Sequence, residues 1–198
     1  MGQPGWSAYD EGYLRAYQWA ASLGAGTALP QEATSLQLGP GEVAHAQVAP
    51  VNVVGYYGEN VEYRPSVFLL GGPVGLALTG AASIAHNQTK KREAERAAVP
   101  RWHQLGMADL VMTSQRLALS KQGRVESFWY AESGAPDWAA GGAPAIQLQP
   151  AGMPLLRLET PWAPLLYVFV HHLLDGRPPG VPLPDGLLDR ARVEGRLA

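Results

Sequence analysis

The sequence contains no cysteine and few charged residues, and both absences narrow the possible functions. Without cysteine the chain cannot form a disulfide, a thiolate nucleophile or a cysteine-ligated metal site. Charged residues make up 16% of the 198 positions and the net charge is −2, which gives no electrostatic footprint for nucleic acid. Hydrophobic residues make up 46%, so we predict one folded domain with tails and no nucleic-acid partner.

Signatures of catalysis and nucleotide binding are also missing. Residues 75–80 have the spacing of a phosphate loop, but Ala81 and Ala82 stand where a lysine and a hydroxyl residue must follow. His171 and His172 are neighbours, and neighbours on a helix point about 100° apart, so they cannot chelate one metal together. We therefore predict no enzyme, no catalytic residue, no metal and no cofactor, and the sequence identifies no small-molecule ligand.

Residues 1–35 are predicted to form a short helix, at about 9–22, followed by a linker. Tyr9, Tyr13 and Tyr17 recur at every fourth position, which places them on one helical face. This face either contacts a partner or packs the helix on its own domain. The N-terminus has neither a basic start nor an apolar run, so we expect no secretory signal and a cytoplasmic protein. An excess of arginine over lysine indicates a bacterial source with a GC-rich genome.

Alternating apolar residues predict two hairpins in the second half of the chain. They alternate in two runs, Leu110/Met112 and Leu117/Leu119, Lys121–Gly123 can form a turn, and a third run follows at 125–130. A second hairpin is predicted at 146–158, around a Pro-Ala-Gly turn. Nearer the N-terminus, the valine-rich segment 36–58 fits one or two strands.

A helix is predicted after the second hairpin. Apolar residues from Leu165 to Leu174 recur at spacings of three and four, Pro161 precedes them, and Gly176 can cap the C-terminal end. The remaining residues, 176–198, form a Pro-rich tail that ends in one short helix.

Three segments carry a family resemblance. They are Pro40–Glu42, the strand Leu110–Leu117 with its Thr-x-x-Arg-Leu motif, and the helix 162–174. In this order they resemble the pleckstrin-homology-like (PH-like) and GRAM-like domains of bacterial proteins, over about 36–58 and 108–175. The resemblance implies an α+β fold, in which a mainly antiparallel, partly open barrel carries a C-terminal helix.

The resemblance also implies structural roles for the motif. Thr113 and Arg116 would hydrogen-bond the backbone at the bend between two strands. Alternate apolar side chains of these strands would face the core, namely Leu110, Met112, Leu117 and Leu119. The chain departs from the family pattern by a helical insertion at 59–107, so the predicted domain is 36–175 with this insertion.

The insertion contains an uncharged stretch. Residues 66–86 carry no charge and are long enough for a bilayer, which needs about twenty residues. Their glycines and proline make a stable span energetically marginal, and a single crossing would separate strands of one predicted sheet. The alternative is a helix from Pro73 to about Val99, apolar in its first half and charged in its second.

A basic stretch follows the uncharged one. Five basic residues oppose two glutamates between 90 and 101, which leaves a local charge of +3. This charge suits an anionic membrane surface, near which each basic residue contributes about 1 kcal/mol. A solvated helix end would also account for it. Trp102, beside a Gly- or Pro-containing loop, either anchors the core or belongs to a binding surface.

These observations predict a non-catalytic binding or scaffolding module. The inserted helix would contact a protein partner or the anionic inner face of a membrane, where the protein would be peripheral. The predicted contact residues are Lys90, Lys91, Arg92, Arg96, Arg101 and Trp102. The alternative is a single-pass membrane-anchored protein in which residues 66–86 span the bilayer.

Overall fold

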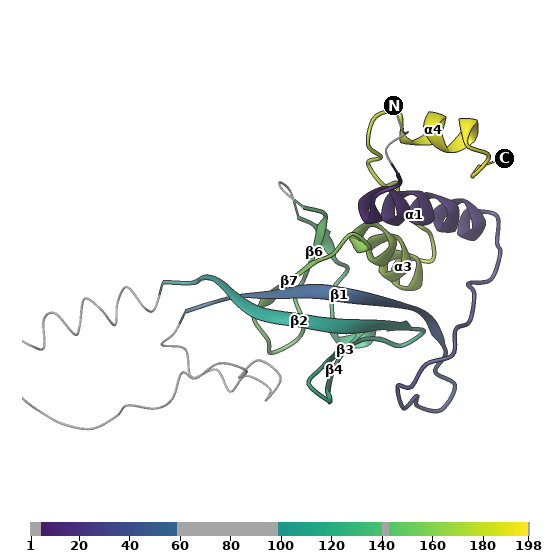
Figure 1. Cartoon of the computed structure of the whole chain (residues 1–198). Coiled ribbons are helices and arrows are strands. Elements are labelled where there is room, and N and C mark those ends of the chain that lie inside the picture. Colours follow the sequence, from purple (N-terminus) through teal and green to yellow (C-terminus); the bar gives the residue numbers. More distant parts are fainter. Residues whose placement is uncertain (1–4, 59–98, 140–142, 198) are drawn as a thin grey trace, which may run out of the picture.

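A curved antiparallel β-sheet forms the centre of the fold (Figure 1). The computed structural model describes residues 5–58, 99–139 and 143–197. In this part of the chain seven strands lie in the order β4-β3-β2-β1-β7-β6-β5, and neighbouring strands are antiparallel. Their bounds are β1 (Ala44–Tyr57), β2 (Arg101–Thr113), β3 (Arg116–Lys121), β4 (Arg124–Trp129), β5 (Asp137–Trp138), β6 (Ala145–Leu148) and β7 (Leu155–Glu159). The sheet is not closed, because β4 and β5 end this order, and the predicted α+β class is confirmed.

Both predicted hairpins are present. β2, β3 and β4 form a meander in which Leu110 lies opposite Leu119, and a short 3₁₀ helix, η1 (Tyr130–Glu132), follows β4. Gln122 and Gly123 connect β3 to β4 with positive φ angles of 52° and 77°. Two such residues in succession match the right-handed twist of the flanking strands. β6 and β7 form the second hairpin.

β1 and β2 pair along their length into a long ribbon. The register ends with Tyr57 opposite Arg101, and this end of the ribbon projects beyond β3 and β4 (Figure 1). Residues 101–107, which the sequence assigns to the insertion, instead form the first half of β2. The insertion was therefore predicted too long at its C-terminal end. Residues 59–98, which include most of the predicted helix, lie outside the described residues.

A β-bulge explains why the first half of β2 was missed. Val53 lies opposite Gly106 and Val54 lies opposite Gln104, so Leu105 is an extra residue on β2. Gly106 has a φ of 101°, a conformation that glycine adopts readily. The extra residue interrupts the two-residue alternation by which a strand is recognised in a sequence.

One strand, not two, forms in the segment 36–58. It begins at Ala44, and the residues before it form a loop. Two leucines of this loop, Leu36 and Leu38, pack against a small apolar cluster formed by Ala44, Val111 and Ala118. The loop therefore covers part of the sheet face that lies away from the main core.

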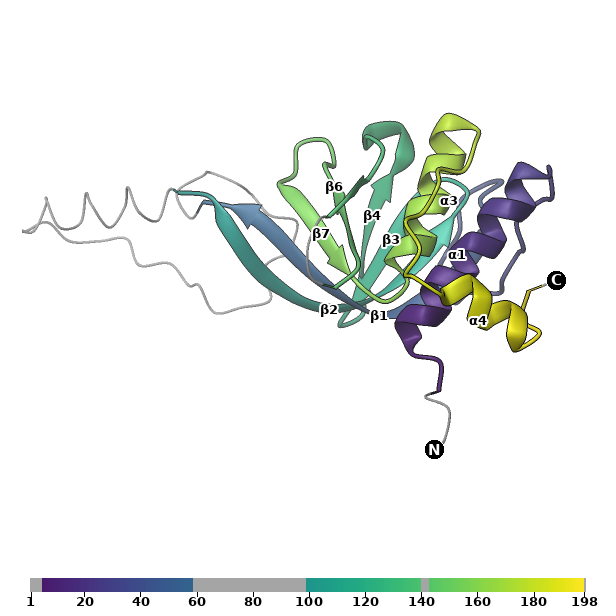
Figure 2. The ribbon, with the colours of Figure 1, turned by 90° about the horizontal axis from the view of Figure 1, so that it is seen from above.

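Three α-helices in the described residues stack in layers on the sheet (Figures 1 and 2). α3 (Ala163–Asp175) lies against the sheet, α1 (Ala8–Gly24) lies on α3, and α4 (Leu187–Val193) lies on α1. The crossing of α1 over the start of α3 depends on Gly12. A Cβ atom at Gly12 would come within 1.9 Å of the Pro161 carbonyl oxygen. Only glycine permits this approach.

The first helix packs on its own domain, which is one of the two alternatives for its aromatic face. Ala16 and Leu23 join the main core. Tyr13 is half-buried against Trp138, with ring centroids 6.3 Å apart, whereas Tyr9 is largely exposed. Trp138 is therefore part of the packing between α1 and the second hairpin.

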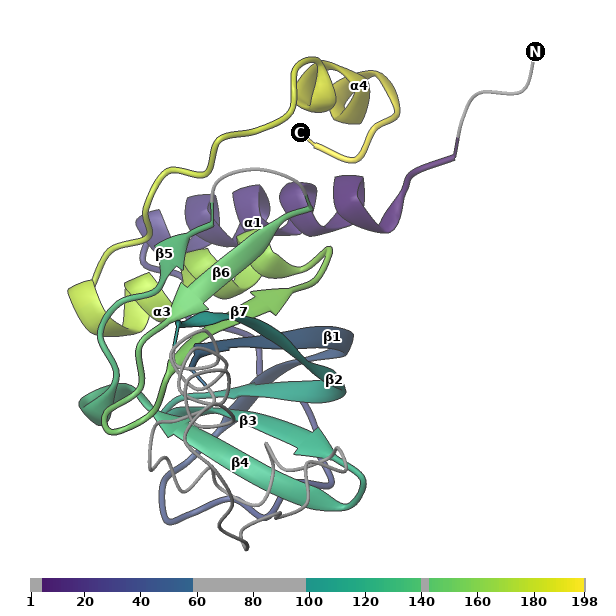
Figure 3. The same ribbon diagram turned by 90° about the vertical axis from the view of Figure 1, so that its left-hand side faces the viewer.

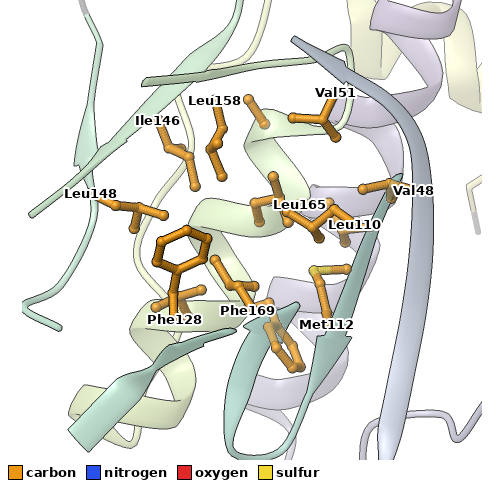
Figure 4. Packing of buried hydrophobic residues seen from close by; sticks show 14 of the residues in the cluster. Val48, Val51, Leu110, Met112, Phe128, Ile146, Leu148, Leu158, Leu165 and Phe169 are labelled. Atoms are coloured by element: carbon orange, nitrogen blue, oxygen red, sulfur yellow. The ribbon is translucent and has the colours of Figure 1, made fainter. Parts of the chain in front are cut away.

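The main core lies between the concave face of the sheet and α3 (Figure 4). Leu165 and Phe169 of α3 are fully buried and meet side chains from both halves of the sheet. The four residues that the family resemblance places in the core are confirmed there, namely Leu110, Met112, Leu117 and Leu119. Figure 3 shows β6 and β7 of the second hairpin on one side of the β1–β2 ribbon and β3 and β4 on the other side.

The two ends of the chain are held together on the outer side of α1. The Trp6 ring contacts two guanidinium groups, with its centroid 4.5 Å from the guanidinium carbon of Arg190 and 4.3 Å from that of Arg196. Its indole N–H donates to Glu194. Arg196 also forms a two-pronged ion pair with Glu11 of α1, with N···O distances of 2.7 and 2.8 Å. The tail therefore ends in the predicted short helix, and this helix is docked.

Candidate functional site

Two exposed aromatic side chains lie together at the projecting end of the β1–β2 ribbon. Tyr56 and Trp102 are direct cross-strand partners, and their ring centroids are 5.1 Å apart. Each is 40% exposed. Exposed tryptophan is uncommon on a folded domain unless it contacts something, so this pair is the first candidate for a contact surface.

The pair extends into a row across three neighbouring strands. Tyr56 also lies opposite Leu155 of β7. Its neighbour Tyr57 and the neighbour of Leu155, Leu156, pack against the main core, so Tyr56 and Leu155 point to the opposite face of the sheet. We call Leu155, Tyr56 and Trp102 the outer row. It forms an apolar edge on the face of the sheet that α3 does not cover.

Exposed apolar side chains are most frequent on the β1–β2 ribbon. Nine large hydrophobic side chains in the described residues are exposed. Four of them belong to the ribbon or lead into it, namely Tyr56, Val99, Trp102 and Met107. The others are spread over α1, β4, α3 and α4, so the ribbon carries the largest concentration.

The opposite face of the ribbon end is tightly packed. The rings of Tyr57 and His103 stack with centroids 4.2 Å apart, and His103 Nε2 is hydrogen-bonded to the Tyr57 carbonyl at 3.0 Å. Gly55 leaves the space for this stack, because a Cβ there would lie 3.2 Å from the Tyr57 ring and 3.1 Å from Leu105. A glycine covered by a neighbouring aromatic ring is a known way to stabilise a strand. The packed face formed by Tyr57 and His103 therefore supports the outer row from the other side of the sheet.

The structure places two of the six predicted contact residues. Arg101 and Trp102 are the first two residues of β2, and both are exposed. The other four lie outside the described residues, namely Lys90, Lys91, Arg92 and Arg96. Tyr56 and Leu155 were not predicted, because their position beside Trp102 depends on a strand register that the sequence does not reveal.

A polar cluster at the Thr-x-x-Arg-Leu motif has a structural role. The Arg116 Nε donates to Glu42 at 2.8 Å, and the Thr113 hydroxyl donates to the same carboxylate at 2.7 Å. Thr113 also accepts the backbone N–H groups of Gln115 and Arg116, and Arg116 donates to the Gln37 carbonyl. The backbone contacts of Thr113 at the bend are therefore confirmed, whereas the Arg116 side chain bonds the backbone of the loop before β1 and not that of the bend.

Glu42 in this cluster is charged but inaccessible. Burial raises the pKa of its carboxyl group, but hydrogen bonds from Arg116, the Gly39 N–H and Thr113, together with the Arg116 charge, bring the pKa below its ordinary value. Its side chain has no exposed surface, so no substrate can reach it. The cluster joins the loop before β1 to the meander and offers no catalytic group.

The described part of the chain contains two further polar features, His171 and a cleft beside β2. No three His, Asp or Glu side chains there come together as metal ligands. His171 is bound to Asp175 at 2.8 Å and to the Pro136 carbonyl at 3.0 Å. A shallow cleft of about 380 Å³ lies beside Met107, but its Lys121 ammonium already donates to a backbone carbonyl.

No family model matches the chain, and no match was found among curated proteins or solved structures. The function is therefore argued from the residues and their geometry. Among the described residues, no helix combines the length and the apolar content that a bilayer crossing requires.

Proposed function

We propose that the chain is a non-catalytic binding module with a PH-like scaffold, which contacts the anionic surface of a membrane through the end of the β1–β2 ribbon and the segment that follows from it. The observation that carries this proposal is the exposed aromatic pair of Tyr56 and Trp102 at the ribbon end, where Trp102 directly follows the most basic stretch of the sequence.

The arrangement of elements supports a PH-like scaffold. The antiparallel sheet is open, and the helix after the last strand fills its concave face. The Thr-x-x-Arg-Leu motif lies at the bend between β2 and β3, where Thr113 bonds the backbone. Such a scaffold does not by itself define a ligand, so the contact surface must be argued from its own residues.

Charge favours a lipid surface as the partner. Residues 90–101 carry a charge of +3 in a chain whose net charge is −2, so the remainder of the chain carries −5. A molecule with this charge distribution turns its basic stretch toward an anionic membrane, and each basic residue near the surface contributes about 1 kcal/mol. Tryptophan and tyrosine favour the same interfacial region.

The register of the ribbon argues against a single membrane crossing by residues 66–86. Tyr57 and Arg101 are paired, so the chain leaves and re-enters the sheet at the same place. One crossing would bring the two ends of the segment to opposite sides of the bilayer and break this pair. Contact from one side of the membrane agrees with the pairing.

Vesicle binding tests the proposal. The full chain is mixed with vesicles of phosphatidylcholine alone, or with phosphatidylglycerol added, and the bound fraction is measured by sedimentation. We expect binding to the anionic vesicles that weakens with salt. The double variant K90Q/K91Q removes two charges, about 2 kcal/mol, and should lower binding about thirtyfold at low salt.

The control variant is R177Q/R192Q, which removes the same charge from the exposed C-terminal part of the chain. We expect it to bind as the unchanged protein does. Absence of binding to anionic vesicles would overturn the membrane proposal and leave a protein as the partner. Retention in the membrane pellet after carbonate extraction of cells would overturn peripheral contact in favour of a span.

A further inference from the structure

The outer row is part of the folded sheet. Leu155, Tyr56 and Trp102 come from three strands and are held in register by backbone pairing. On the other face, the Tyr57 and His103 stack supports the same end of the ribbon. The row therefore has a fixed position relative to the domain, whatever the connecting segment does.

The row directly behind the outer row is more polar at its surface. It contains Arg157, Val54 and Gln104, in which Val54 is buried between two polar side chains. In the row beyond it, Asn52 donates to Glu159 at 2.8 Å and lies opposite Met107, which is 53% exposed. The aromatic tip and the polar row directly behind it match the change of polarity across the headgroup region of a bilayer.

We propose that the outer row is an interfacial anchor that lies in the headgroup region of an anionic bilayer and orients the domain with its ribbon end toward the membrane. This inference rests on the proposed function. It assigns to Tyr56, Leu155 and Trp102 a role in lipid contact that the basic stretch alone does not require.

The size of the row favours lipid over a protein partner or a second copy of the chain. A stable protein interface buries about 1,200–2,000 Å² in total, with some 20–30 residues on each side. The outer row has three side chains, two of them only 40% exposed. One or two aromatic side chains are enough at a membrane surface when basic residues supply the long-range attraction.

The connectivity of the chain brings the row to the membrane. Arg101, at the end of the +3 stretch, directly precedes Trp102. A basic stretch that lies on anionic lipid therefore holds the aromatic pair within one or two residues of the surface. The apolar contact then strengthens membrane binding that electrostatic attraction has already started.

The test compares aromatic variants in the full chain. Y56S, W102S and the double variant are bound to phosphatidylcholine vesicles with phosphatidylglycerol added. We expect the double variant to lower the partition coefficient about tenfold or more, and to retain less binding than K90Q/K91Q at raised salt, where charge is screened. Y9S is the matched control, because Tyr9 is 43% exposed on α1, and it should bind unchanged.

Quenching by lipids brominated near the headgroup separates contact from altered folding. The difference in fluorescence between the unchanged protein and W102F reports Trp102, and this difference should be quenched by the brominated vesicles. W102F itself keeps an aromatic ring and should keep most of the binding. Thermal unfolding of each variant shows whether the fold is retained.

The outcomes distinguish the two proposals. If K90Q/K91Q weakens binding while Y56S/W102S binds normally and Trp102 is not quenched, the interfacial anchor is overturned and the proposed function stands. If Y56S/W102S weakens binding no more than Y9S does, the anchor is likewise overturned. If the unchanged protein does not bind anionic vesicles, both proposals fail.

Discussion

Glu42 and Arg116 form a buried ion pair that joins the loop before β1 to the start of β3. Arg116 donates to both carboxylate oxygens, from Nε at 2.8 Å and from the terminal nitrogen at 3.1 Å. The Glu42 side chain is fully buried and that of Arg116 is 12% exposed. A two-pronged pair of this kind fixes the orientation of both partners, so the loop that carries Leu36 and Leu38 is held on the sheet.

Arg116→Ala should destabilise the protein strongly. The substitution leaves the Glu42 carboxylate buried without its cation, which costs about 3–5 kcal/mol of unfolding free energy. Arg116→Lys keeps the charge but loses the second hydrogen bond to the carboxylate, so it should lower the unfolding free energy by less than Arg116→Ala does. Urea denaturation measures both. Arg192→Ala, which breaks the exposed pair with Asp189, should change stability by about 1 kcal/mol or less. An equal loss in the two alanine variants would contradict a role for the buried pair.

The ion pair should also make stability depend on pH in the acidic range. The pKa of Glu42 is lower in the folded protein than the ordinary value of 4.5, so the folded state holds this proton less tightly than the unfolded state. The stabilisation is therefore complete above about pH 4.5 and is lost as the pH falls through the folded pKa. Glu42→Gln should be less stable at pH 7, and its unfolding free energy should fall less steeply between pH 5 and about pH 2. Parallel curves for the two proteins would contradict this assignment.

Gly12→Ala should destabilise the protein, against the usual trend for a helix. Alanine in place of a helical glycine normally adds about 0.5–1 kcal/mol of stability. At Gly12 the new Cβ would lie 1.9 Å from the Pro161 carbonyl oxygen, so α1 must move away from the start of α3. Gly24→Ala, in the last turn of the same helix with no atom within 4 Å of the new Cβ, should be neutral or stabilising. Thermal unfolding compares the two, and a stabilising Gly12→Ala would show that the helices can separate freely.

Helices and hairpins that are indicated by residues close together in the sequence could be predicted. The helix α3 has apolar residues at helical spacing and ends at Gly176, whose φ of 70° is the left-handed cap that the glycine predicted. The meander and the second hairpin have turn residues at their centres. These signals lie within about ten residues of one another, so no knowledge of the fold is needed to find them.

Features that depend on distant pairing could not be predicted. The partner of Tyr56 across the ribbon is Trp102, and its partner on the other side is Leu155. Neither pairing can be recognised in the sequence, because strand register is set by the packing of the whole sheet. Of the three residues in the outer row, the sequence therefore pointed only to Trp102, and the two residues that complete the row were not predicted.

The contact of Trp6 with the C-terminal helix should hold the two ends of the chain together independently of the main core. Leu14, Leu187 and Ala191 are the buried apolar residues of this layer, and none of them belongs to the main core cluster. Trp6→Ala removes the ring that contacts the guanidinium groups of Arg190 and Arg196, and a hydrogen-bond donor to Glu194.

Trp6→Ala should therefore loosen α4 while leaving the sheet nearly unchanged, because each exposed cation–π contact contributes only about 0.5–1 kcal/mol. Hydrogen exchange should become faster in residues 187–197 and stay slow in the β2–β3 meander. Val193→Ala changes a side chain on α4 that is 85% exposed, and it should leave exchange as it is in the unchanged protein. If exchange in α4 is the same with and without Trp6, the helix is held by its small apolar contact alone.

Raised salt should also make exchange in α4 faster, as Trp6→Ala does, because the ion pair between Arg196 and Glu11 is partly exposed and is screened.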